Sequence, residues 1–217
     1  MAAAAQISTN PPRTDYAFKV LVVGDPRVGK TSIINRYVHG SFDIHYKLTL
    51  GVDFALKVIH RPSSIIRLQL RDIAGQEKAG TMTRVYYRDA NAAVVVFDVT
   101  RNITLQSVKT WKQDIDSKLS LPDGRRIPAV LLANKCDLDA DPAVTEQVLQ
   151  DLVTEDQFIG WFLTSAKDDK NVAEAFNFLV DRAISDYEAT RRFQQDNRPQ
   201  GTISLSQNDR RGGNCSC

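Results

Sequence analysis

The chain has 217 residues, of which 42% are apolar and 25% are charged, and its net charge is +2. These values are typical of one soluble globular domain with tails, and the mixed charges give no basic stripe for a nucleic acid partner. Three cysteines are too few for a disulfide framework, which favours a reducing compartment. No apolar run approaches the ~20 residues that a membrane-spanning helix needs.

Three regions are expected along the chain. Residues 1–16 are expected to form a disordered leader, because they lack the charged and apolar regions of a secretory signal. Residues 17–193 carry alternating strand and helix patterns and form the predicted domain. From residue 194 the sequence is rich in Gln, Asn, Ser and Gly, which indicates a flexible tail over 194–217.

The first half of the domain combines a strand, a helix and a hairpin. The apolar run at 18–24 predicts a buried strand, and apolar residues at helical spacing predict a helix at 29–39. The segments 52–60 and 64–72 alternate apolar and polar residues. A proline and two serines lie between these segments, so together they predict a hairpin.

The second half of the domain repeats a strand-and-helix unit. Apolar runs predict buried strands at 91–99, 127–135 and 160–166. Helical stripes alternate with these runs, at 103–119, 144–153 and 170–193. This order predicts an α/β fold with a mostly parallel six-stranded sheet and helices on both faces.

Residues 24–31 read GDPRVGKT, the pattern of a loop that wraps phosphate in backbone N–H groups. The loop follows a predicted strand and opens a predicted helix, whose N-terminus also favours anions. Lys30 would reach the β- and γ-phosphates, and the Thr31 hydroxyl would bind Mg²⁺. Pro26 and Arg27 stand where such loops usually carry small residues, and Pro26 has no N–H to donate.

A second pattern, DIAGQ at 72–76, ends the predicted hairpin. Asp72 can hold Mg²⁺ directly or through water, and the Gly75 N–H can approach a γ-phosphate closely. Gln76 can orient an attacking water molecule. Taken alone, this pattern is also compatible with an ordinary strand-to-turn exit. Its place downstream of a phosphate loop favours the functional interpretation.

Two further patterns, NKCD at 134–137 and TSAK at 164–167, also follow predicted strands. The Asp137 carboxylate can accept hydrogen bonds from N1–H and the 2-amino group, which guanine offers and adenine does not. The Ala166 N–H can donate to guanine O6, and Ser165 can brace the loop. Ligands of α/β sheets bind at the carboxyl ends of the strands, where all four patterns lie.

In their order and spacing, these four elements closely resemble the Ras superfamily of small GTPases over residues 18–190. The domain is therefore expected to be a small G domain of the P-loop NTPase type. The segments LGVDF (50–54) and TRVYYRDA (83–90) and the terminal CSC favour the Rab branch. Segments such as DIAGQE and GWFLTSAK resemble the Rab subgroup that serves lysosome-related organelles such as melanosomes.

The resemblance implies a role for each site residue. Gln76 would be catalytic, and Mg²⁺ would be held by Thr31, Thr49 and Asp72. The phosphates of GTP or GDP would be bound by Gly24, Asp25, Arg27, Val28, Gly29, Lys30, Thr31 and Gly75. Guanine and ribose would be bound by Ser32, Phe42, Tyr46, Asn134, Lys135, Asp137, Ser165, Ala166 and Lys167.

The resemblance also implies two switch segments, at 43–54 and 73–88, and a lipidated C-terminus. Effector and switch residues would be Leu50, Gly51, Val52, Phe54, Arg71, Ile73, Ala79 and Tyr86. Cys215 and Cys217 would both receive geranylgeranyl groups. Two lipids are expected because one acyl chain anchors a protein only marginally and the tail is too weakly basic to supply a second signal.

The implied partners are those of a membrane-tethered switch in vesicle traffic. They comprise an exchange factor, a GTPase-activating protein, effectors, Rab escort protein, geranylgeranyl transferase, GDP-dissociation inhibitor and the membrane itself. The expected location is the cytoplasmic face of lysosomes or lysosome-related organelles, with a soluble pool in the cytosol. Hydrolysis is expected to be slow without an activating protein.

Two departures from the Rab pattern leave alternatives open. Pro26 and Arg27 raise the alternative of a GTP-bound scaffold with very slow turnover, although Arg27 is not expected to strain the backbone. Arg71 and Ala79 replace aromatic residues that are usual in Rab proteins, which favours a narrower set of effectors. A phosphotransferase such as a nucleoside kinase shares the phosphate loop, but it would leave NKCD and the terminal cysteines unexplained.

Overall fold

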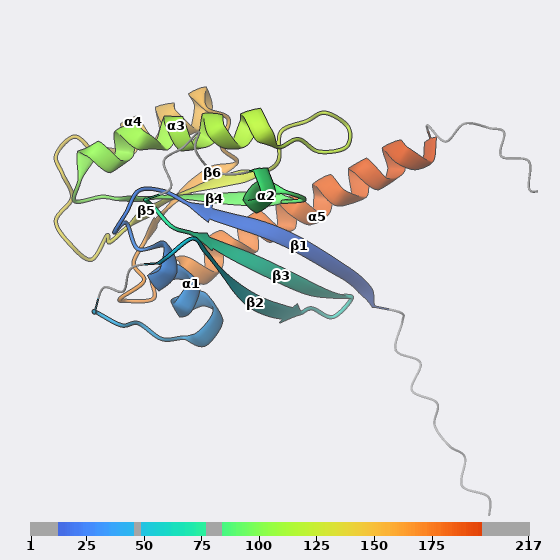
Figure 1. Cartoon of the computed structure of the whole chain (residues 1–217), viewed down its shortest axis with the longest axis horizontal. Coiled ribbons are helices and arrows are strands. Elements are labelled where there is room, and N and C mark those ends of the chain that lie inside the picture. Colours follow the sequence, from blue (N-terminus) through green and yellow to red (C-terminus); the bar gives the residue numbers. More distant parts are fainter. Residues whose placement is uncertain (1–12, 46–48, 77–83, 197–217) are drawn as a thin grey trace, which may run out of the picture.

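A computed structural model of the chain describes residues 13–45, 49–76 and 84–196 (Figure 1). The strands are β1 (Thr14–Val23), β2 (Val52–His60), β3 (Ser64–Ile73), β4 (Ala92–Asp98), β5 (Ala129–Asn134) and β6 (Gly160–Thr164). The helices are α1 (Lys30–His39), α2 (Arg84–Tyr87), α3 (Asn102–Lys118), α4 (Glu146–Glu155) and α5 (Val172–Asp196).

The six strands form one sheet in the order β2-β3-β1-β4-β5-β6. The hairpin pair β2 and β3 is antiparallel, and every other neighbouring pair is parallel. The fold class predicted from the sequence is therefore confirmed. Because β1, β3, β4, β5 and β6 run in the same direction, the loops that follow them meet at a single edge of the sheet.

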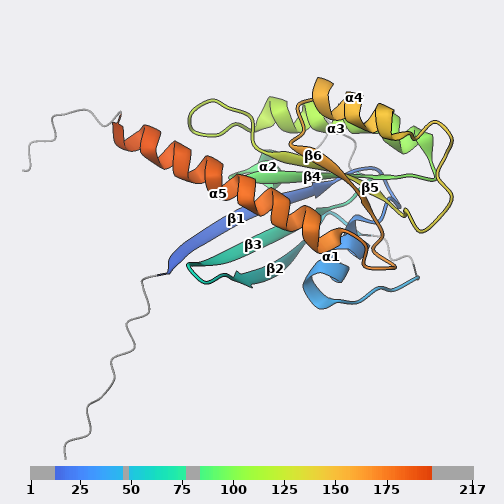
Figure 2. The same cartoon turned by 180° about the vertical axis from the view of Figure 1, so that it is seen from behind.

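Helices cover both faces of the sheet, and each face has its own apolar core (Figure 2). On one face, α1 and α5 pack against residues of β1 and β3 such as Phe18 and Leu68. On the other face, α3 and α4 pack against Leu21, Phe97 and Leu131. Alternate residues of β1 enter the two cores, as a strand with period two requires.

The ordered domain is longer at both ends than the sequence predicted. Strand β1 begins at Thr14 rather than at 18, so it includes residues assigned above to the leader. Tyr16 is buried there, and its hydroxyl donates to Glu188 at 2.7 Å. Helix α5 continues to Asp196, past the predicted boundary at 193. Residues 1–12 and 197–217 lie outside the described residues.

The described helices do not include one with the length and apolar character needed to cross a membrane.

The ring stack between Tyr37 of α1 and Phe176 of α5 is the closest aromatic contact between these two helices, with centroids 4.2 Å apart. Replacing the fully buried Phe176 by Ala should lower the free energy of unfolding by about 3–5 kcal/mol, because it leaves a cavity. Ile103→Ala is the control, since Ile103 is 64% exposed and should change stability by less than about 0.5 kcal/mol. Urea denaturation of the two variants measures both values, and equal losses would contradict this account of the core.

Candidate functional site

The phosphate-loop pattern forms a tight turn between β1 and α1 in which only glycine fits at two positions. A Cβ on Gly24 would lie 2.1 Å from the carbonyl oxygen of Val96. A Cβ on Gly29, which caps α1 with a φ of 99°, would lie 2.3 Å from Asn134 Nδ2. Close packing on both sides therefore fixes the path of the loop.

Arg27 adopts a φ of 65°, in the left-handed region. The expectation that Arg27 would not strain the backbone is therefore wrong, since this region costs an L-residue roughly 1–2 kcal/mol. The Arg27 side chain is exposed and lines the cavity described below, as predicted from its outward direction. The carbonyl of the preceding Pro26 accepts a hydrogen bond from Arg101 Nη2 at 3.1 Å.

Lys30 lies across the inside of the loop. Its ammonium donates to the carbonyls of Gly24 at 2.9 Å and Asp25 at 3.0 Å. Burial lowers the pKa of Lys30 to about 8, while the charges of Asp72 and Asp25 act in the opposite direction. A buried ammonium held among carbonyls, next to open space, is suited to an anionic partner that would restore its usual pKa.

The three predicted Mg²⁺ residues lie together. The Thr31 hydroxyl donates to Asp72 Oδ2, and the hydroxyls of Thr31 and Thr49 are 2.9 Å apart. Burial raises the pKa of Asp72, although Thr31 and Lys30 act to lower it. Asp72 Oδ1 is buried without a hydrogen-bond partner. Such an oxygen beside two hydroxyls fits a hard divalent cation, which prefers oxygen ligands.

Gly75 brings the second pattern against the phosphate loop. A Cβ on this residue would lie 2.5 Å from Pro26 N and 2.6 Å from Lys30 Nζ. The absence of a side chain therefore lets the 74–76 turn approach the loop and the Lys30 ammonium. The exposed Gln76 follows and also lines the cavity.

The NKCD and TSAK patterns form neighbouring loops after β5 and β6. Asn134 Nδ2 donates to Val28 O at 2.8 Å, so this side chain supports the phosphate loop. The Asp137 side chain accepts from Ser165 Oγ at 2.7 Å and is only 8% exposed. Ala166 is buried beside them. The bracing role predicted for Ser165 matches this contact.

A cavity of about 630 Å³ joins these loops. Its lining includes predicted residues from all four patterns and from the segment after α1: Arg27, Gly29, Lys30, Thr31, Ser32, Phe42, Thr49, Gly75, Gln76, Asn134, Lys135, Asp137, Ala166 and Lys167. Gly24, Asp25, Val28, Asp72 and Ser165 lie behind this lining. Tyr46 lies outside the described residues. The structure thus brings the described nucleotide residues together.

Sequence reasoning missed several lining residues and the side chains that hold the loops from behind. Asn35, Asp43, Ile44, His45 and Leu138 also line the cavity. Their proximity to predicted residues was the available signal.

Two supporting contacts join the phosphate loop to the region of α3. Trp111 Nε1 donates to Asp25 Oδ1 at 2.9 Å. Arg101 joins Pro26 to the buried Asp98, whose Oδ2 accepts from Arg101 Nε at 3.0 Å and from Lys135 Nζ at 2.6 Å. No sequence motif indicated these contacts, because they depend on how α3 packs.

The predicted effector residues are partly exposed. Leu50 and Phe54 are 80% and 67% exposed, whereas Ile73 is completely buried and cannot contact a partner in this conformation. Arg71 lies over the Phe54 ring at 6.0 Å and donates to the carbonyls of Tyr86 at 2.7 Å and Arg88 at 3.0 Å. Ala79 lies outside the described residues.

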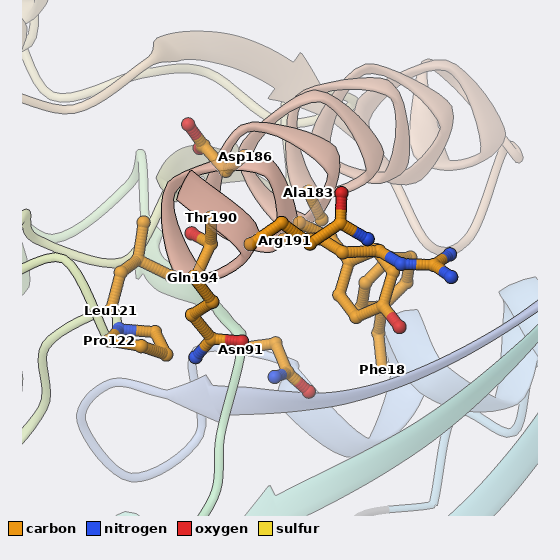
Figure 3. A pocket seen from close by; sticks show the side chains of 11 residues that line it. Phe18, Asn91, Leu121, Pro122, Ala183, Asp186, Thr190, Arg191 and Gln194 are labelled. Atoms are coloured by element: carbon orange, nitrogen blue, oxygen red, sulfur yellow. The ribbon is translucent and has the colours of Figure 1, made fainter. Parts of the chain in front are cut away.

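A second cavity, of about 450 Å³, lies between α5, β1 and the loop after α3 (Figure 3). Its buried Asp186 is paired with Arg125 at 2.7 Å and with Arg182 at 3.0 Å. The carboxylate is therefore neutralised, and this cavity is a poor candidate for a catalytic site.

The sheet topology, the phosphate loop and the paired base loops define a nucleotide-binding P-loop protein with a small G domain. A model of the Ras family matches residues 19–185, and the chain belongs to this family. As a family member it binds GTP and GDP, generally with Mg²⁺, and it hydrolyses GTP.

The similar proteins are Rab GTPases, so the chain lies in the Rab branch. It is 52% identical to human Ras-related protein Rab-32 over 180 residues, which cover 82% of this chain and 80% of the relative. It is 54% identical over 173 residues to Rab-32A of Dictyostelium discoideum, covering 78% and 79%. It is 53% identical over 171 residues to human Rab-7L1, covering 78% and 84%. These similarities support a GTPase switch in vesicle traffic.

Asp137 is expected to select guanine through its 2-amino group and N1–H. Asp137→Ala should weaken GDP binding about 10- to 100-fold, because hydrogen bonds to a charged group are lost. Binding of IDP, which lacks the 2-amino group, should fall less. Asp139→Ala is the control, since Asp139 is exposed in the same loop. Equilibrium competition against a fluorescent GDP measures both, and a wild-type protein that bound ADP as well as GDP would contradict the assignment.

Proposed function

We propose that the chain is a membrane-tethered GTP/GDP switch that recruits effectors in the biogenesis of lysosome-related organelles. One observation carries this proposal: four loops after parallel strands meet around a single cavity, with a buried ammonium at one end and a nearly buried carboxylate at the other. This spacing of a cation and an anion suits the phosphates and the base of one guanine nucleotide.

Each end of the cavity has its own role in binding. Lys30 and the backbone of residues 24–31 hold the phosphates, and Thr31, Thr49 and Asp72 hold Mg²⁺, which supplies charge neutralisation when it is bound. Asp137 and the Ala166 N–H read guanine. Asn134 and Lys135 support the neighbouring loops through Val28 and Asp98.

Gln76 is the residue that orients water for hydrolysis. It lies at the cavity wall directly after Gly75, which itself lies against the phosphate loop. The alternative of a scaffold with very slow turnover has no support, because its Rab relatives belong to a family that hydrolyses GTP. Family membership likewise removes the nucleoside kinase alternative.

The segments around Thr49 and Gln76 would present different surfaces in the GTP and GDP states. Thr49 joins Thr31, and Gly75 joins the loop at Pro26, so both segments begin at groups that hold the γ-phosphate and Mg²⁺. Effectors would contact the exposed Leu50 and Phe54 beside Arg71.

The tail supplies the membrane attachment in this proposal. Geranylgeranyl groups on Cys215 and Cys217, which lie outside the described residues, would anchor the chain after delivery by Rab escort protein. GDP-dissociation inhibitor would maintain the cytosolic pool. The lysosomal setting rests on the resemblance to the melanosome-type Rab subgroup, and imaging of the tagged protein beside organelle markers tests it.

Replacing Gln76 by Leu should slow single-turnover GTP hydrolysis at least about tenfold, since the water loses its orienting group. GDP release should not change. Gln69→Leu is a matched control, because Gln69 is exposed on β3 away from the cavity. Phosphate release from GTP-loaded protein is the measurement. Equal rates for the two variants would remove Gln76 from the mechanism.

Arg71→Trp should change which proteins bind the GTP-bound form. The substitution restores an aromatic residue beside Phe54 and removes two hydrogen bonds to the chain at 86–88. Arg67→Trp is the control, because Arg67 lies four residues earlier on the same strand and is also exposed. Affinity capture from cell extract with a non-hydrolysable GTP analogue compares them. An identical partner list for Arg71→Trp and wild type would contradict the role of Arg71 in specificity.

A further inference from the structure

Arg36 on α1 binds three backbone carbonyls that belong to two different segments. Its Nε donates to Ala166 O at 2.8 Å, and its Nη2 donates to Lys167 O at 2.9 Å. Its Nη1 donates to Gly40 O at 2.7 Å, at the residue that caps α1. The five N–H donors of a guanidinium lie in one rigid plane, so this side chain fixes directions as well as distances.

Ala166 is held on both sides. Before it, Ser165 is fixed through its hydroxyl to Asp137 at 2.7 Å and through two backbone hydrogen bonds to Lys170. After it, the two successive carbonyls of residues 166 and 167 are those that Arg36 binds. The orientation of the Ala166 N–H is therefore set by Asp137 on one side and by α1 on the other.

Helix α1 gives this contact a connection to the phosphate end of the cavity. The helix begins at Lys30 and Thr31, and Arg36 lies less than two turns further along it. The Arg36 side chain thus joins the base loop at 164–167 to the helix whose first residues face the phosphates. The two ends of the cavity are kept at a fixed separation by one helix and one guanidinium.

We propose that Arg36 is a positioning residue for base recognition, which holds the 164–167 loop so that the Ala166 N–H remains directed at the 6-oxygen of guanine. This inference rests on the proposed function. Arg36 itself touches backbone only, so it acts through the loop. Its loss should weaken the contact to the 6-oxygen and leave the phosphate contacts and the water-orienting group in place.

The test compares release of two nucleotides from the full-length chain. One is GDP, and the other is the diphosphate of 2-aminopurine riboside, which keeps the 2-amino group and lacks the 6-oxygen. Arg36→Ala should release GDP about tenfold faster, as expected for the loss of one hydrogen bond of this kind. Release of the 2-aminopurine nucleotide should change less than about twofold, and the rate of hydrolysis of bound GTP should be unchanged.

Two further variants control for charge and stability. Arg36→Lys keeps the charge but presents one point donor instead of a planar fork, so it should release GDP at an intermediate rate. Arg61→Ala removes an arginine that pairs with Asp181 of α5 and touches neither loop, so GDP release should match wild type.

Unchanged GDP release in Arg36→Ala, or equal acceleration for both nucleotides, would overturn the proposal. If Arg36→Ala does not fold, the same comparison of two nucleotides with Arg36→Lys decides the question. A wild-type protein without a preference for GDP over ADP would instead overturn the proposed function, so the two failures are distinguishable.

Discussion

The hydrogen bond from the Asn134 amide to the Val28 carbonyl joins the phosphate loop to the end of β5, and the site depends on it. The amide lies so close to the loop that Gly29 has no room for a side chain. The curvature of the loop and the position of the base loop are therefore set by one contact. A protein with the same loop sequence but no partner at this position would have no fixed distance between the phosphate and base ends.

Helix α3 extends this constraint to the switch region. Trp111 fixes Asp25 in the phosphate loop, and Asp114, one turn further along, accepts from the Tyr87 hydroxyl at 2.5 Å. Burial raises the pKa of Tyr87, and the hydrogen bond to Asp114 raises it further, so Tyr87 remains a donor. Tyr87 ends α2, in the predicted second switch segment. One rigid helix therefore touches the phosphate loop and the far end of that segment.

The fold and the nucleotide loops could be predicted from the sequence because both are local signals. Apolar runs of the right length identified the strands, and each motif was contiguous in the chain. The contacts of Arg36, Arg101 and Trp111 could not be predicted, because each joins residues separated by 75 or more positions and depends on helix packing. The left-handed φ of Arg27 was missed for a related reason, since a turn forced by neighbouring strands overrides the preference of a single residue.

The two departures from the Rab pattern act through backbone carbonyls. Pro26 cannot donate, but its carbonyl is bound by Arg101, so the loop gains a fixed point at the residue that lacks an N–H. Arg71 adds charge where an aromatic residue is usual, yet its guanidinium binds the carbonyls of Tyr86 and Arg88 while lying over Phe54. Each substitution thus restricts backbone next to a segment that senses the γ-phosphate. In the Ras family, where switching depends on ordering such segments, a restriction of this kind changes the free-energy difference between the two states without altering any group that touches the nucleotide.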